Sequence, residues 1–186
     1  SDSLILANAV NSLTVSNVET LTGDSGADTV TIATAVGAGS TIDLADGNDA
    51  LVLSAAVSGA TIDLGAGTGD SVTLANATND LTLSNAETVT GNAGADTVTM
   101  GAAISGAVID LNAGTDTLKL FNGANDITVS DVETITGDAG ADTVTLGAAI
   151  SGAVVDLAAG TDILELANGT NNLTVSNAET ITGESG

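Results

Sequence analysis

The chain has 186 residues with 24 acidic side chains, one lysine, no histidine and no cysteine, and its formal net charge is −23 at pH 7. The absence of cysteine excludes disulfides and zinc–thiolate sites. So acidic a chain repels nucleic acid and anionic membrane surfaces, and its composition favours cations as partners.

The apolar residues indicate a thin core. Hydrophobic residues make up 43% of the chain, yet Phe121 is the only aromatic one. Aromatic side chains bury the largest areas, so a core of Val, Ile, Leu and Ala suits a narrow solenoid better than a thick globule. No apolar run reaches the roughly 18 residues of a membrane-spanning helix, so membrane insertion is not expected.

Short strands are predicted along the whole chain from a period of two. Val30 and Ile32 alternate with threonines, and similar alternations follow at 41–44 and 173–176. Apolar residues therefore face inward and polar residues outward. Turns rich in Gly, Asn and Asp separate the strands, and no proline removes a backbone donor from a ladder.

Eight aspartates, each followed by such a strand, mark a repeat that alternates irregularly between longer and shorter spacings. They are Asp2, Asp28, Asp49, Asp70, Asp96, Asp116, Asp142 and Asp162. A phrase that begins at Asn11 recurs from Asn79, from Asn125 and from Asn171. Repeats of this size predict a solenoid.

From these spacings we expect an all-β fold, a parallel β-solenoid (β-helix or β-roll) of about eight rungs of roughly 20–26 residues. The usual rule for parallel crossovers predicts a right-handed coil. Short rungs are expected to hold two strands. Long rungs are expected to hold a third, which begins at Glu19, Glu87, Glu133 or Glu179. Residues 1–186 form a single segment in this interpretation.

The two ends of the sequence match one another. Residues 183–186 read Gly-Glu-Ser-Gly, and Ser1-Asp2 would complete the turn that they begin, as in the run before Asp142. No capping segment is visible, so this phase match predicts one period of a longer tandem array, or a filament of separate chains stacked head to tail. The expected partner is a further copy of the chain itself.

One turn motif carries a family resemblance. Residues 23–31 read Gly-Asp-Ser-Gly-Ala-Asp-Thr-Val-Thr, and 91–99 and 137–145 are alike. This motif resembles the calcium-binding nonapeptide of the repeats-in-toxin (RTX) family. The phrase at 17–23 is also similar to β-strand repeats of very large bacterial surface proteins. The RTX resemblance implies calcium at the eight aspartates and at Gly23, Gly26, Gly91, Gly94, Gly137 and Gly140.

Simple electrostatics also favours a cation at stacked aspartates. Two carboxylates one rung apart repel by roughly 1 kcal/mol in water and by about 3–4 kcal/mol at an effective dielectric of 20. Calcium takes about 6–8 oxygen ligands and reverses the sign. Glycine is expected to supply the left-handed φ that aims carbonyls at the ion. The opposite turns lack the motif, so calcium is expected along one edge only. The alternative is an Asx turn, in which each aspartate bonds its own backbone.

Two other residue types recur with the phrase. The asparagines are expected to form turns, and they are Asn8, Asn11, Asn76, Asn79, Asn122, Asn125, Asn168 and Asn171. The four glutamates named above are expected to be solvated surface charges, with extra cation ligands as the alternative.

The chain has no His, Cys, Tyr or Arg, so it lacks most general bases and nucleophiles and no enzyme is expected. We expect a calcium-stabilised structural fibre, stalk, surface-layer or matrix segment, secreted or on a bacterial cell surface. One alternative is the repeat region of a calcium-dependent adhesin. Another is ice binding through pairs such as Thr29 and Thr31, although Ala50 and Val52 interrupt that row on the next rung.

Overall fold

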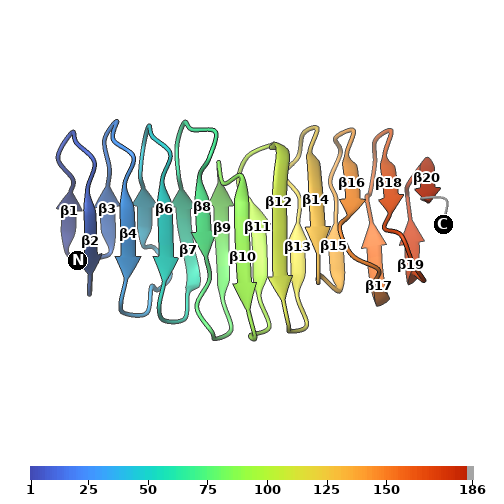
Figure 1. Ribbon diagram of the computed structural model, residues 1–186, viewed down its shortest axis with the longest axis horizontal. Coiled ribbons are helices and arrows are strands. Elements are labelled where there is room, and N and C mark those ends of the chain that lie inside the picture. The colour runs from blue at the N-terminus through green and yellow to red at the C-terminus, as the bar shows by residue number, and fades with distance from the viewer. Residues whose placement is uncertain (184–186) are drawn as a thin grey trace.

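A computed structural model describes residues 1–183, which contain 20 strands and no helix. Successive strands alternate between two parallel ten-stranded sheets, so the chain winds along one axis from its N-terminal to its C-terminal end (Figure 1). The odd sheet contains β1 (Ser3–Ile5), β3 (Thr20–Thr22), β5 (Thr41–Asp43), β7 (Ser58–Asp63), β9 (Asp80–Ser84), β11 (Thr97–Met100), β13 (Thr117–Lys119), β15 (Thr134–Thr136), β17 (Ser151–Asp156) and β19 (Asn172–Ser176). The even sheet contains β2 (Ser12–Val15), β4 (Thr29–Ile32), β6 (Ala50–Leu53), β8 (Ser71–Thr73), β10 (Thr88–Asn92), β12 (Ser105–Asn112), β14 (Asp126–Ser130), β16 (Thr143–Leu146), β18 (Ile163–Leu166) and β20 (Thr180–Gly183).

Each strand pairs with the next strand of its own sheet, one coil further along the chain. In the even sheet Ser12 pairs with Thr29, and Thr29 pairs with Ala50. In the odd sheet Thr97 pairs with Thr117. Ten strands in each sheet give nine such steps, so the predicted parallel β-solenoid is confirmed. Within residues 1–183, no helix is present that could cross a membrane.

The core is one layer of side chains between the two sheets. Val30, Leu51 and Val72 pair on successive coils of the even sheet and are 0–1% exposed. The strands alternate buried and exposed positions, as the period of two predicted. Burying one such side chain stabilises the fold by about 1.5–3 kcal/mol. A layer this thin is filled by aliphatic side chains, so none of the buried core residues within 1–183 is aromatic.

The predicted division into short and long rungs is wrong. The strands after the four glutamates are β3, β10, β15 and β20, and they are ordinary members of the two sheets rather than third strands. The long spacing between Asp2 and Asp28 consists of one complete coil, from Asp2 to Glu19, and a crossing from Glu19 to Asp28 on the other sheet. The predicted match between the chain ends involves residues 184–186, which lie outside the described residues.

Three β-bulges interrupt the ladders, each at a Ser-Gly-Ala triplet. The register shifts between Ser58 and Ala60, and again at the equivalent triplets of β12 and β17. The glycines in these bulges are Gly59, Gly106 and Gly152, and their φ values are +72°, +79° and +85°. Glycine adopts this left-handed conformation without the steric cost that a Cβ brings. The coil that follows each bulge begins with one of the recurring asparagines, Asn79, Asn125 or Asn171.

Candidate cation site at the acidic columns

Seven of the eight predicted aspartates lie immediately before strands and stack into columns. Each column begins with asparagine, continues with aspartates and ends with glutamate. The first column is Asn11, Asp28, Asp49, Asp70 and Glu87. The second column is Asn79, Asp96, Asp116 and Glu133. The third column is Asn125, Asp142, Asp162 and Glu179.

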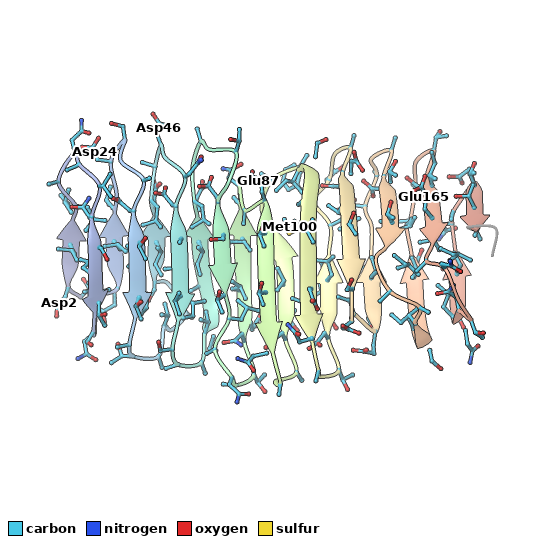
Figure 2. All side chains as sticks on the ribbon, in the orientation of Figure 1. Asp2, Asp24, Asp46, Glu87, Met100 and Glu165 are labelled. Atoms are coloured by element: carbon cyan, nitrogen blue, oxygen red, sulfur yellow. The ribbon has the colours of Figure 1, made fainter. Side chains whose placement is uncertain are left out.

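The columns lie on both edges of the solenoid. The first and third precede strands of the even sheet, and the second precedes strands of the odd sheet. Strands of the two sheets run in opposite directions across the solenoid, so they start at opposite edges (Figure 1). Figure 2 shows Asp2, before an odd strand, at the lower edge and Glu87, before an even strand, toward the upper edge. The prediction that the aspartates form one row along one edge is therefore wrong.

The columns alternate between the two edges because each repeated block contains an odd number of strands. The block that runs from Asn79 up to Asn125 contains five strands, β9 to β13. Because five is odd, each repeat of the same sequence begins in the other sheet. The aspartate spacings alone do not show this alternation, because a glutamate takes the place of an aspartate at the end of each column.

Within each column, every acidic side chain accepts the backbone N–H of the preceding coil. The Asn79 N–H donates to Asp96 Oδ1 at 3.0 Å, and the Asp96 N–H donates to Asp116 Oδ1 at 2.7 Å. The Asp116 N–H donates to Glu133 Oε2 at 2.8 Å, which closes the column. The first and third columns repeat this pattern. The glutamates are therefore column ends, a role that neither sequence interpretation gave them.

The second oxygen of each column aspartate has no such partner. The seven aspartates from Asp28 to Asp162 are 0–1% exposed, and each has a buried Oδ2 without a hydrogen bond. Burial raises the pKa of Asp49 and Asp116 to about 6. It also raises the pKa of Asp70, Asp96 and Asp142. An unpaired buried polar group costs about 1–3 kcal/mol, and more if it is charged, so each Oδ2 favours a positive partner.

The motif glycines act through close approach rather than through unusual φ. None of the six predicted site glycines has a positive φ, so the expected left-handed conformation is wrong for them. A Cβ on Gly94 would overlap the carbonyl of Ala77 in the preceding coil, and one on Gly114 would overlap the carbonyl of Gly94. The Gly114 Cβ would also lie 2.8 Å from Asp116 Oδ2. A stack of carbonyls therefore runs beside the aspartates. Gly23, Gly91 and Gly137 instead face the backbone of Leu44, Leu111 and Leu157 in the next coil.

These oxygens fit a hard cation such as calcium. Calcium takes carboxylate and carbonyl oxygens and water in flexible geometry, and the columns supply a buried, unpartnered Oδ2 beside stacked carbonyls. No three acidic side chains within residues 1–183 converge on one point where they could hold a metal ion. Carbonyls or water would have to complete the ligand set. The Asp2 N–H donates to Glu19 Oε2 as in the columns, but the Asp2 side chain is exposed in the first coil rather than buried.

Threonine rows cover part of the outer faces, and they are interrupted. Thr29 and Thr31 pair with Ala50 and Val52, as the sequence predicted. A longer row crosses five strands of the odd sheet before it meets Lys119, and it contains Thr20, Thr41, Thr61, Thr82 and Thr99. Beside it, Thr22 is followed by Asp43 and Asp63, so no flat two-row threonine face forms there.

Comparison with protein families, with curated proteins and with solved structures finds no match to this chain.

Proposed function

We propose that this chain is a calcium-stabilised structural segment of an extracellular fibre or stalk, which extends by end-to-end stacking of coils. One observation carries the proposal: two parallel sheets run without a break from the first strand to the last. All inter-strand hydrogen bonds therefore point along one axis. Each coil contacts only its neighbours, so length can be added without changing the fold.

The end coils favour stacking on a further coil. Leu4 and Leu13 at one end, and Leu173 and Val175 at the other, are only partly buried although they point into the core layer. Ile181 is 51% exposed, whereas its pairing partner Leu164 is fully buried. Uncovered apolar side chains and open strand edges are a template for further pairing. The stacking coil belongs either to a second copy or to a continuation of the same polypeptide.

The columns also indicate how such an assembly would be completed. In the second column, the Asn79 N–H donates to Asp96 in the following coil. Asn171 occupies the same position in the last coil of the odd sheet, and Asp2 precedes the first strand of that sheet. A copy stacked with its Asp2 beside Asn171 would form a column of Asn171, Asp2 and Glu19. The Asp2 N–H already donates to Glu19 Oε2 at 2.6 Å.

Calcium is the cation that this proposal assigns to the columns. Bound at Oδ2 of the buried aspartates, it would neutralise carboxylates and ligate the adjacent carbonyls. Extracellular modules bind calcium with dissociation constants of about 10⁻⁴–10⁻³ M, so a modest site suffices outside the cell. The extracellular location rests on this cation requirement and on the acidic composition.

Stacking is tested by substituting lysine at one end. Ile181→Lys should suppress concentration-dependent filaments, because it places a charge where a second copy would bury the side chain. The loss of about 1.5–3 kcal/mol of burial corresponds to a rise of roughly tenfold to a hundredfold in the assembly concentration. Val108→Lys is the matched control, since Val108 is 48% exposed in β12, in the middle of the even sheet. Light scattering and electron microscopy provide the readout. Monomers of the unsubstituted chain at every concentration would contradict stacking between copies.

The cation is tested with chelated protein at about pH 7.5, above the raised pKa values of Asp49 and Asp116. Millimolar calcium should raise the melting temperature measured by calorimetry and strengthen the β-sheet signal in circular dichroism. The reason is that the buried, unpaired Oδ2 atoms gain a positive partner. Sodium chloride at matched ionic strength is the control for screening. Identical melting curves in chelator and in calcium would remove calcium from the proposal and leave the structural fibre standing.

A further inference from the structure

The asparagine at the head of each column occupies the same position as the aspartates below it. Asn79 Oδ1 accepts the Val57 N–H at 3.2 Å, just as Asp96 Oδ1 accepts the Asn79 N–H at 3.0 Å. The two turns also stack directly, because a Cβ on Gly94 would overlap the carbonyl of Ala77. Asp96 Oδ2 therefore corresponds to Asn79 Nδ2.

The asparagine amide has a full set of partners at this point. Asn79 Nδ2 donates to the carbonyls of Ala75 at 3.0 Å and Ala77 at 2.9 Å, and to Asp96 Oδ1 at 2.8 Å. In the third column, Asn125 Nδ2 donates to Phe121, Gly123 and Asp142 in the same way. Asn11 repeats the pattern in the first column. The position of this amide nitrogen is therefore surrounded by acceptors, which favour a hydrogen-bond donor or a positive charge there.

An aspartate at this position places Oδ2 beside those carbonyls, and because Oδ2 is itself an acceptor no hydrogen bond can form. The carbonyls equivalent to Ala75 and Ala77 belong to Asn92 and Gly94 in the turn before Asp96, because they stand at the same offsets from the column residue. This correspondence explains why Oδ2 of every column aspartate is buried without a hydrogen bond. The amides of Asn79 and Asn125, in contrast, donate hydrogen bonds to these acceptors.

We propose that the side-chain amides of Asn11, Asn79 and Asn125 are built-in replacements for a bound cation, so that cations bind only at the seven buried aspartates. The sites then fall into groups of three, two and two on alternating edges: Asp28, Asp49 and Asp70; Asp96 and Asp116; Asp142 and Asp162. The head coil of each column closes without an ion. This inference rests on the calcium binding proposed above and adds to it where calcium is absent and what takes its place.

Reciprocal substitutions in the full chain test the proposal. In chelator, Asp96→Asn should raise the melting temperature by about 2–6 °C, because the new amide donates to the carbonyls of Asn92 and Gly94 and to Asp116 Oδ1. In calcium, the same variant should bind one ion fewer by metal analysis and gain less on calcium addition. Asn79→Asp should do the reverse, with a lower melting temperature in chelator, recovery in calcium and one ion more. Asp46→Asn is the control for removal of one charge, since Asp46 is exposed outside the columns (Figure 2).

The outcomes separate this inference from calcium binding itself. If the unsubstituted chain responds to calcium but Asp96→Asn melts lower than it in chelator, the amide does not replace the ion and the inference is overturned. If the chain shows no response to calcium, the proposed cation is wrong, yet a higher melting temperature of Asp96→Asn in chelator still supports the amide as the partner that Oδ2 lacks. Unchanged ion counts in both variants, with a normal calcium response, would also overturn the inference.

Discussion

At the scale of the residue, the columns depend on close contact between successive turns. Gly94 lies against the Ala77 carbonyl, Gly26 against that of Ala9, and Gly140 against that of Gly123. None of these glycines has a positive φ. The Gly-x-Asp motif thus meets two requirements. The glycine leaves space for a carbonyl of the preceding coil, and the aspartate carboxylate accepts a backbone N–H of that coil.

This close contact predicts the effect of one methyl group. Gly94→Ala should destabilise the chain by about 1–3 kcal/mol, the usual cost of overpacking, because the added Cβ meets backbone that cannot move aside. Gly37→Ala should be neutral or slightly stabilising, since nothing lies within 4 Å of its Cβ position and its φ is not positive. Urea denaturation followed by circular dichroism measures the difference. Equal midpoints for the two variants would show that the turns are looser than described.

At the scale of the element, the strands and the bulges have different structural roles. The strands form the core layer, and each of the three Ser-Gly-Ala bulges lies one coil before a recurring asparagine. The residue before each bulge donates its N–H to that asparagine: Val57 to Asn79, Ile104 to Asn125 and Ile150 to Asn171. The bulge therefore presents the first donor of a new column.

A bulge glycine should tolerate asparagine better than a β-branched residue. Gly106 has open space around its Cβ position but a φ of +79°. The cost of a substitution is then conformational, about 1–2 kcal/mol for most side chains and less for asparagine. We expect Gly106→Val to lower the melting temperature and Gly106→Asn to lower it less. Calorimetry in calcium and in chelator provides the test, and the reverse ranking would assign the glycine a packing role instead.

The strands and the solenoid were predictable from the sequence, but the length of one coil was not. Alternation at 29–32 and 41–44 predicted β4 and β5, since a period of two has one physical meaning. One coil is shorter than the spacing between Asp2 and Asp28 suggests, because Asp2 aligns with Glu19 and not with Asp28. A glutamate reaches the same backbone N–H with a longer side chain. Glu-Thr-Leu-Thr at 19–22 and Asp-Thr-Val-Thr at 28–31 are the signal that would have revealed the equivalence.

At the scale of the whole molecule, we expect stability to depend more on the order of residues in each column than on which sheet a strand joins. Deleting residues 79–124 removes one block of five strands and places Asn125 where Asn79 was. Every later strand then changes sheet, but each column keeps its order of asparagine, aspartates and glutamate. We expect this variant to fold with a melting temperature close to that of the full chain.

Deleting residues 88–124 is the matched control. It removes β10 to β13, an even number of strands, so later strands stay in their sheets. Asp70 would then stack on Asn125 instead of Glu87, and the first column would lose its end. We expect this shorter deletion to melt lower than the five-strand one, as measured by circular dichroism. If the shorter deletion melts higher, keeping each strand in its original sheet contributes more to stability than keeping the order of the columns.

The odd number of strands in each block has a mechanical consequence. A block is carried onto the next by a half-turn about the fibre axis, which makes the repeat a twofold screw. Any shortening that ions produce along one column pulls on one side, and the next column pulls on the opposite side. A molecule with all its aspartates on one edge would bow when it took up ions. Here five of the buried aspartates lie on one edge and two on the other, so under the proposed ion binding the pull would be divided between both edges instead of falling on one.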